Sequence, residues 1–177
     1  MDIDDRELVG RCRAGDTAAF GQLVERYQRA VYTMALRMLG NPEDAKDATQ
    51  VAFVRAYRSL DTFDENRRFF SWLYRIGVNE CLNALRSRRP DDTLTPAVAA
   101  AATPYDTVAT LERRAQLQAA LQTLSPDYRA VIVLRHFGDM SYDEIADALG
   151  IEVKTVKSRL HSARQRLGER LLGWRAS

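Results

Sequence analysis

The sequence predicts an all-α protein in which two small helical domains are joined by a flexible linker, the C-terminal domain containing a helix-turn-helix. Three observations support this. Apolar residues recur at helical spacing along most of the chain. No stretch alternates with period two or carries an Asn-Gly or Asp-Gly hairpin signal, and one segment rich in Pro, Thr and Ala interrupts the helical pattern. Of the 177 residues 46% are hydrophobic, which is enough for a buried core.

The interruption defines the domain organisation. From residue 89 it reads RPDDTLTPAVAAAATPYDTVAT and holds three of the five prolines. Proline lacks a backbone donor and disfavours helix in the residue before it, so this stretch favours a linker. We therefore expect a first domain at residues 1–90, a linker at 91–110 and a second domain at 111–177.

The helices of the first domain are predicted from their start and stop signals. Asp16 suits the N-cap of a long helix that Gly40 ends, and Pro42 suits the first turn of the next helix. The polar residues 61–66 predict a loop. The expected helices span residues 4–13, 16–39, 42–60 and 67–87.

Similar signals divide the second domain. Pro126 suits a helix start, and Ser141 stands three residues before Glu144, the spacing of a capping box. Gly138 and Gly150 predict helix ends. The expected helices span residues 108–123, 126–137, 141–149 and 153–171.

The last two helices have the pattern of a helix-turn-helix, because a short helix that ends at glycine is followed by a tight turn and a basic helix. One stripe of the basic helix is apolar, comprising Val153, Val156, Leu160, Ala163 and Leu167. The opposite face holds side chains that can reach base edges, flanked by arginines placed to meet phosphates. These candidates are Lys154, Thr155, Lys157, Ser158, Arg159, His161, Ser162 and Arg164. The alternative is an amphipathic helix with a solvated basic face.

The helix expected at 42–60 carries apolar residues on its outer face. Its inner stripe is formed by Ala45, Ala48, Ala52 and Ala56. The outer face gathers Asp47, Gln50, Val51, Val54 and Arg58. Valines among charged and amide side chains are typical of a protein-docking face. The alternative is a slightly apolar solvated surface.

The helix expected at 67–87 has an aromatic and polar stripe formed by Trp72, Arg75, Asn79, Asn83 and Arg86. Aromatic rings stack on unpaired bases, amides read base edges and arginines hold phosphates, so the stripe indicates a nucleic-acid surface. Aromatic residues are more often core, and we expect core packing for Phe69, Phe70 and Tyr74. We do not expect it for Trp72, because its neighbours on that face are polar.

The formal net charge of +2 hides an uneven distribution. Residues 61–90 carry six basic and four acidic side chains, residues 151–177 carry seven and two, and residues 91–110 carry no basic one. Two separated basic ends suggest two contacts with a polyanion. The alternative is that lysines and arginines only solvate helix ends. The near-neutral total argues against tight independent DNA binding.

Other classes of protein are not expected. Cys12 and Cys81 lie far apart without metal-ligand spacing, which predicts neither a disulfide framework nor a metal site and fits a reducing compartment. The acidic start is unlike a secretory signal, and no apolar run reaches the about 18 residues that span a bilayer. No GxxxxGK, HExxH or GxSxG motif occurs, so we expect no enzyme, cofactor or small-molecule substrate.

Three motifs in this order resemble those of the bacterial sigma-70 family, specifically its extracytoplasmic-function (ECF) group. The first is DAKDATQVAFVRAY at residues 44–57, and the second is FFSWLYRIGVN at residues 69–79. The third is SYDEIADALG at 141–150, followed by TVKSRLHSAR at 155–164. The resemblance extends from about residue 16 to 171. Two departures are Gly77, where alanine is usual, and Ser162, where some relatives carry arginine.

The resemblance implies a sigma factor that binds core RNA polymerase, reads the −10 and −35 promoter elements and promotes DNA melting. It implies that the docking face of the first motif binds the coiled coil of the polymerase largest subunit. The implied −10 readers are Asp61, Phe63, Asn66, Arg67, Trp72, Arg75, Asn79, Asn83 and Arg86, with an everted base captured near the 61–68 loop. The implied −35 readers are the eight candidates on the basic helix.

The same resemblance implies the partners. They are core RNA polymerase, at its coiled coil and flap region, promoter DNA in duplex and single-stranded form, and an anti-sigma factor. The linker would pass through the polymerase near its active-site and RNA-exit channels, and the protein would act in the bacterial cytoplasm without membrane contact. The alternative function is a stand-alone helix-turn-helix transcriptional regulator with a sensing domain. The second nucleic-acid stripe argues against that alternative, because a sensing domain needs none.

Overall fold

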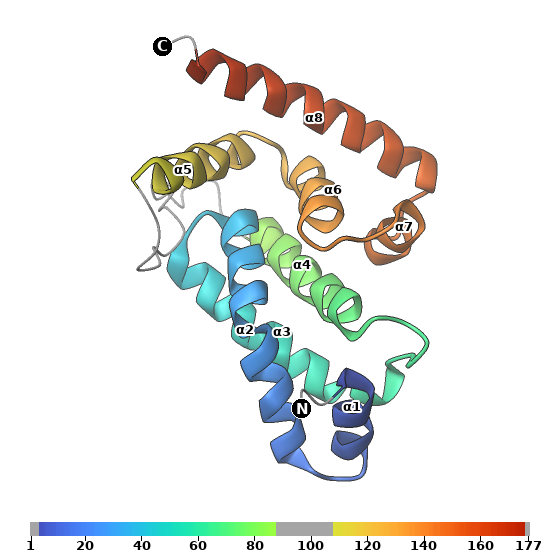
Figure 1. Ribbon diagram of the computed structural model, residues 1–177. Coiled ribbons are helices and arrows are strands. Elements are labelled where there is room, and N and C mark those ends of the chain that lie inside the picture. The colour runs from blue at the N-terminus through green and yellow to red at the C-terminus, as the bar shows by residue number, and fades with distance from the viewer. Residues whose placement is uncertain (1–3, 88–107, 176–177) are drawn as a thin grey trace.

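The computed structural model describes residues 4–87 and 108–175, and all regular structure in these two ranges is helical (Figure 1). The predicted all-α fold class is therefore confirmed. The elements are α1 (Asp5–Arg13), α2 (Thr17–Leu39), α3 (Pro42–Arg58), the 3₁₀ turn η1 (Leu60–Thr62), α4 (Phe69–Ser87), α5 (Val108–Gln122), α6 (Pro126–His136), α7 (Tyr142–Leu149) and α8 (Val153–Arg175). The expected linker at 91–110 lies outside the described residues, except for its last three, which begin α5.

The predicted caps explain most helix boundaries. The Asp16 carboxylate accepts hydrogen bonds from the amides of Ala18 and Ala19 at 3.1 and 3.3 Å. Ser141 and Glu144 form the predicted capping box at the start of α7. Gly40 ends α2 at a φ of 76°, in the left-handed region that glycine adopts without strain.

Most boundaries agree with the prediction to within one residue; α8 ends at Arg175, four residues later than expected, and two others differ by two residues beside the expected loop. The helix expected to reach residue 60 ends at Arg58, because the chain tightens into the η1 turn. The helix expected from residue 67 begins at Phe69. The segment between α3 and α4 is therefore longer than expected by two residues at each end.

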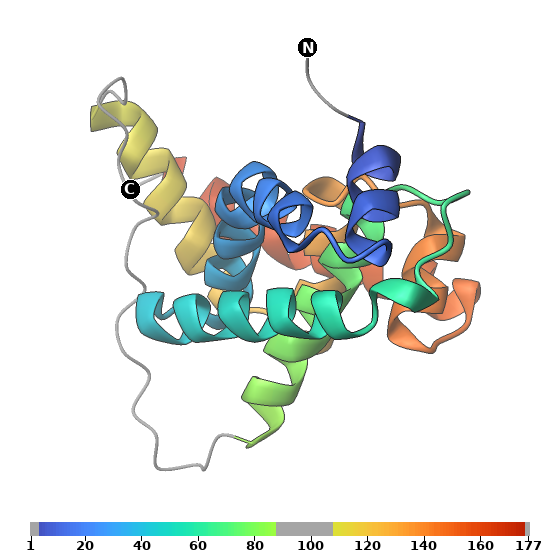
Figure 2. The same ribbon diagram turned by 90° about the horizontal axis from the view of Figure 1, so that it is seen from below.

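The first half of the molecule is built around α2, α3 and α4, which pack on one another, while α1 packs against α2 and η1 (Figures 1 and 2). The predicted alanine stripe of α3 is buried, as are Phe69 and Tyr74 of α4. Gly77 lets α4 approach α2 closely, since a Cβ at this position would lie 2.3 Å from Cε of Met34. Glycine at position 77, where alanine is usual, therefore leaves room for the Met34 side chain of α2.

The second half consists of α6, α7 and α8, with α5 against α8, and it packs on the first half. Helix α4 contacts α6 and α7, and α2 contacts α5 and α6. Side chains of the second half cap the C-terminal end of α2. Gln118 Nε2 donates to the Leu36 carbonyl at 2.7 Å, and Gln122 Nε2 donates to the Arg37 carbonyl at 2.8 Å.

A buried arginine completes this cap. Arg129 of α6 donates to the carbonyl of Met38 in α2 and to the carbonyls of Leu121 and Leu124 in its own half. The last carbonyls of a helix have no partner within the helix, so a buried helix end needs donors from elsewhere. Three side chains from α5 and α6 supply them here. Among the described residues, no helix combines the length and apolar character needed to cross a membrane.

Candidate nucleic-acid and protein-docking surfaces

The helix-turn-helix presents its two faces as predicted. Val156, Leu160 and Ala163 of α8 are buried against α6 and α7. Of the eight candidate base and phosphate contacts, Lys154, Lys157, Ser158, His161 and Arg164 are exposed, and Thr155, Arg159 and Ser162 are half-buried. The exposed set leaves lysine, hydroxyl and imidazole groups on the outer face of α8.

Two arginines that flank this face have partners within the protein. Arg159 pairs with Asp127 of α6 at 3.2 Å. Arg164 Nε donates to Nε2 of His136 at 3.3 Å. Burial and the neighbouring arginines Arg164 and Arg135 lower the pKa of His136, so its ring is neutral and can accept this bond. These arginines brace α8 on α6 in this structure.

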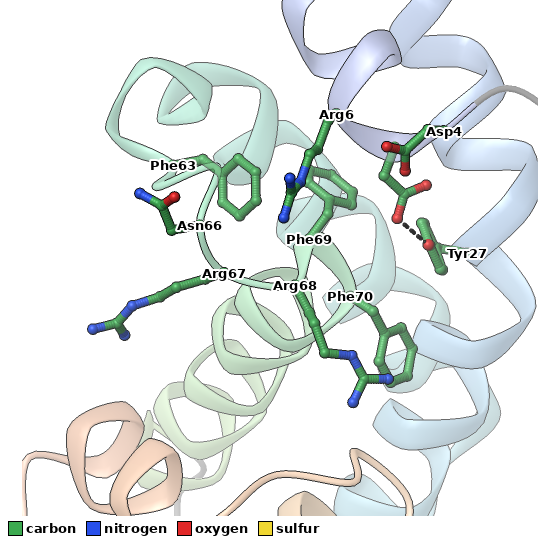
Figure 3. Close-up of a pocket in the computed structure, with 10 residues that line it drawn as sticks. Asp4, Arg6, Tyr27, Phe63, Asn66, Arg67, Arg68, Phe69 and Phe70 are labelled. Carbon is green, nitrogen blue, oxygen red and sulfur yellow. Dashed lines mark hydrogen bonds between the residues drawn. The ribbon is translucent and has the colours of Figure 1, made fainter.

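The loop before α4 forms a pocket with α1 and α2 (Figure 3). The pocket has a volume of about 390 Å³. It is lined by Asp4, Asp5, Arg6, Tyr27, Phe63, Asn66, Arg67, Arg68, Phe69 and Phe70. Aromatic rings and arginines thus lie together at one opening. This arrangement suits a nucleotide, whose base can stack on a ring and whose phosphate can pair with an arginine.

The aromatic wall of this pocket is held by ring contacts. Phe63 packs edge-on against Phe69, with ring centroids 5.5 Å apart, and lies 5.2 Å from the ring of Trp72. The Tyr27 hydroxyl donates to the Asp5 carboxylate. Burial, together with Asp5, raises the pKa of Tyr27 to about 12, so this ring stays uncharged.

The structure brings only part of the predicted −10 set to this pocket. Phe63, Asn66 and Arg67 line it. Trp72 does not, and the expectation that it lies off the core is wrong, because its half-buried ring packs against the core beside the rings of Phe63 and Phe69. Asp61 is exposed in η1 and does not line it. Asn83 instead lines a groove between α3 and α4, together with Asp47 and Val51 of the predicted docking face. Arg86 is exposed on the last turn of α4, about 21 Å along the helix from Trp72.

Helix α7 covers the middle of the α4 stripe. Arg67 and Arg75 each donate to Oδ2 of Asp147, at 3.0 and 3.1 Å. Asn79 Nδ2 donates to the Ala148 carbonyl at 3.2 Å. The stripe that the sequence predicts for nucleic acid therefore contacts the second half of the molecule.

The predicted docking face of α3 is open. Val51 and Val54 are 43% and 49% exposed, well above what large apolar side chains usually show. Asp47, Gln50 and Arg58 are exposed beside them. The groove that borders this face has a volume of about 550 Å³. The patch is apolar at its centre and polar at its margin, as protein interfaces are.

Several residues of these surfaces are missed by sequence reasoning. Tyr57 is 46% exposed beside the valines, and its ring packs on Phe20 of α2. Glu80 lies buried in the groove and pairs with Arg55 at 2.5 Å. Tyr57 closes the first quoted motif, so its place in that pattern could have identified it. The α1 and α2 residues of the pocket carry no local signal.

Two family models match the chain. The model described as Sigma-70 region 2 matches residues 23–90, and that described as Sigma-70, region 4 matches residues 114–167. The ECF RNA polymerase sigma factor SigW of Bacillus subtilis (strain 168) is 36% identical over 184 residues, 97% of this chain and 98% of that protein. The ECF RNA polymerase sigma-E factor of Escherichia coli (strain K12) is 34% identical, covering 96% and 95%.

Two solved structures are similar over most of the chain. One is CnrH in complex with the cytosolic domain of CnrY, with a TM-score of 0.70 at 34% identity, covering 96% of this chain and 97% of that one. The other is the sigma factor RpoE in complex with the anti-sigma factor NepR from Bartonella quintana. Its TM-score is 0.70 at 27% identity, covering 86% and 96%.

Proposed function

The chain belongs to the extracytoplasmic-function group of the sigma-70 family of RNA polymerase sigma factors, and we propose how its surfaces divide the work of promoter recognition. As a sigma factor it directs core RNA polymerase to promoters. The proposal assigns base capture at the −10 element to the pocket before α4, −35 recognition to the outer face of α8, and polymerase docking to the outer face of α3. It includes no catalysed step and places the protein in the bacterial cytoplasm.

The pocket carries the proposal. An everted base loses its stacking on neighbouring bases, which costs a few kcal/mol. Stacking on aromatic side chains contributes about 1–3 kcal/mol per base, so the half-buried ring of Phe70 can offset that loss, with the buried Phe63 supporting the pocket wall. Arg67 and Arg68 stand at the same opening, where backbone phosphates of a captured strand would lie. Because only melted DNA can present such a base, the pocket stabilises the melted state.

The exposed residues of α8 fit the proposed reading of the −35 duplex. Lys157 and His161 lie one turn apart on the outer face, where lysine can donate to guanine O6 and N7. Ser158 adds a hydroxyl beside them. Ser162 is half-buried, and its short side chain leaves that position without the long-range donor of an arginine.

The α3 face fits the proposed contact with the polymerase coiled coil. Val51, Val54 and Tyr57 form an exposed apolar centre that a partner helix can cover, with Asp47 and Arg58 as polar margin. Helix α3 packs chiefly on α2, α4 and η1, and Val51 and Val54 stay exposed, so the proposed docking face is not used by the contact between α4 and α7.

The contact between α4 and α7 places a condition on DNA binding. Arg67 and Arg75 cannot hold phosphates while both pair with Asp147. We therefore infer that the two halves separate before the α4 stripe meets DNA, with core polymerase holding them apart. A partner that stabilises the packed form would keep the factor inactive. The two similar solved structures are complexes of related proteins, one with an anti-sigma factor, so an anti-sigma partner is part of the proposal.

The test is transcription by the chain with core RNA polymerase from its own bacterium, followed by mapping of its promoter. The base analogue 2-aminopurine, placed in turn at each non-template −10 position, should brighten at the everted base. Arg68→Ala should weaken that response, while Arg113→Ala, on the exposed side of α5 and outside the pocket, should not. If no position brightens on an active promoter, base capture is wrong. If the chain supports no transcription but binds a palindromic operator alone, the regulator alternative is correct.

A further inference from the structure

Arg13, the last residue of α1, reaches the irregular segment that precedes α4. Its Nη2 donates to the carbonyl oxygens of Leu60 at 3.0 Å and Phe63 at 2.6 Å. Its Nη1 pairs with the Glu65 carboxylate, and its side chain is only 26% exposed. One guanidinium group therefore binds the backbone at both ends of η1 and the side chain of a residue beyond it.

These contacts act on the wall of the pocket. The backbone of Phe63 is held by Arg13, and the ring of the same residue forms the aromatic wall beside Phe69. Asn66, three residues further, lines the opening, where its amide N–H and side chain both donate to Asp64. Without the guanidinium, the carbonyls of η1 would turn to water and the segment would lose its fixed path.

Helix α1 is firmly attached to the rest of the first half. Leu8 and Val9 are fully buried in the core. At the opposite end of α1, Asp5 pairs with Arg26 at 2.5 Å and accepts the hydroxyl hydrogen of Tyr27. Helix α2 therefore supplies both the anchor for α1 and one ring of the pocket, and Figure 3 shows the α1 and α2 residues facing the loop across the opening.

We propose that Arg13 is a positioning residue for base capture, which fixes the loop so that its aromatic wall and Asn66 keep the spacing that one base requires. This inference rests on the proposed function of the pocket. It explains why arginine stands here. The planar fork of a guanidinium can donate to several acceptors at fixed angles, whereas a lysine ammonium offers one compact centre.

The experiment uses the full chain in holoenzyme with core polymerase and single-stranded oligonucleotides of the mapped −10 element. The base at each position is replaced in turn by an abasic site, and the ratio of affinities for intact and abasic strands is measured. The variants are Arg13→Ala, Arg13→Lys and the control Arg11→Ala. Arg11 lies on the same helix and pairs with Asp16, away from the loop. Thermal unfolding is recorded for each.

In the wild type we expect the ratio of affinities for intact and abasic strands to peak at one position. At that position the ratio should fall roughly tenfold in Arg13→Ala, because the variant loses the hydrogen bonds of a charged group to the loop. Arg13→Lys should restore only part of the ratio, and Arg11→Ala should leave the ratio at its wild-type value. An unchanged ratio in Arg13→Ala, whatever its unfolding temperature, overturns the role of Arg13 while leaving base capture intact. A wild-type ratio that peaks nowhere overturns base capture itself, and this inference with it.

Discussion

Asp147→Asn should strengthen the binding of the free chain to single-stranded −10 DNA. The Asp147 carboxylate accepts hydrogen bonds from Arg67 and Arg75, two residues proposed to meet the DNA backbone. Asparagine has nearly the same shape but no charge, so the substitution weakens both ion pairs without opening a cavity. It should shift the balance between packed and separated halves toward the separated form.

The size of the effect follows from the exposure of the three groups. The side chains of Asp147, Arg67 and Arg75 are 53%, 57% and 40% exposed, so solvent screens both pairs. Exposed pairs contribute about 0.2–1 kcal/mol each, and the two together about 1 kcal/mol after this screening. That corresponds to about fivefold in the equilibrium, and hence to about fivefold tighter binding when the packed form dominates.

The assay is fluorescence anisotropy of a labelled −10 oligonucleotide with the free chain and with the holoenzyme. Asp143→Asn is the matched control, because it removes the same charge from the exposed face of the same helix. The gain should be present in the free chain and absent in the holoenzyme, where core polymerase already separates the halves. Equal gains in Asp147→Asn and Asp143→Asn, or a gain that persists in the holoenzyme, would refute the reasoning.

Three further predictions concern other surfaces. Lys157→Ala or His161→Ala should reduce initiation at promoters that depend on the −35 element by about tenfold, with unchanged affinity for core; loss of core binding would contradict the assignment of α8. Gly77→Ala should raise the free energy of unfolding by less than about 1 kcal/mol in urea titrations. The gain in helix propensity exceeds the cost of moving Met34 Cε, the flexible end of that side chain, and a lower free energy of unfolding would contradict this. His136, whose pKa is lowered by folding, contributes stability above its ordinary value of 6.5 that is lost as the pH falls; His136→Gln should flatten the unfolding temperature between pH 7 and about 5.

Capping residues and helix-ending glycines in the sequence were sufficient to predict where the helices lie. Caps at Asp16, Ser141 and Gly150 act on the nearest backbone groups, so their residue types predict where a helix starts or stops. The faces of α3 and α8 were predicted for a related reason, because a helix places residues three and four apart on one side. The exposed Val54 and the buried Leu160 follow from that period alone.

Contacts between residues far apart in the sequence could not be predicted from these local signals. Asn83 shares a helical stripe with Trp72, but the neighbouring helix decides which groove each enters, and Asn83 lies in the groove between α3 and α4. The partnership of Arg13 with Phe63 joins residues fifty positions apart. Asp147 meets Arg75 across the two halves in the same way. Residue type and spacing carry no information about such pairings, which depend on how whole helices dock.

The side chains that cap the C-terminal end of α2 affect what is exposed to water when the two halves of the molecule separate. Gln118 and Gln122 exchange their bonds to backbone carbonyls for bonds to water, and a typical hydrogen bond contributes only about 0.5–1.5 kcal/mol in this exchange. At this end of α2, separation uncovers amides and carbonyls that water can bond. Elsewhere along the same contact it uncovers apolar side chains of the shared core, such as Tyr74, which lies against Gly138 of the second half. The separated halves therefore need a partner that covers this apolar surface.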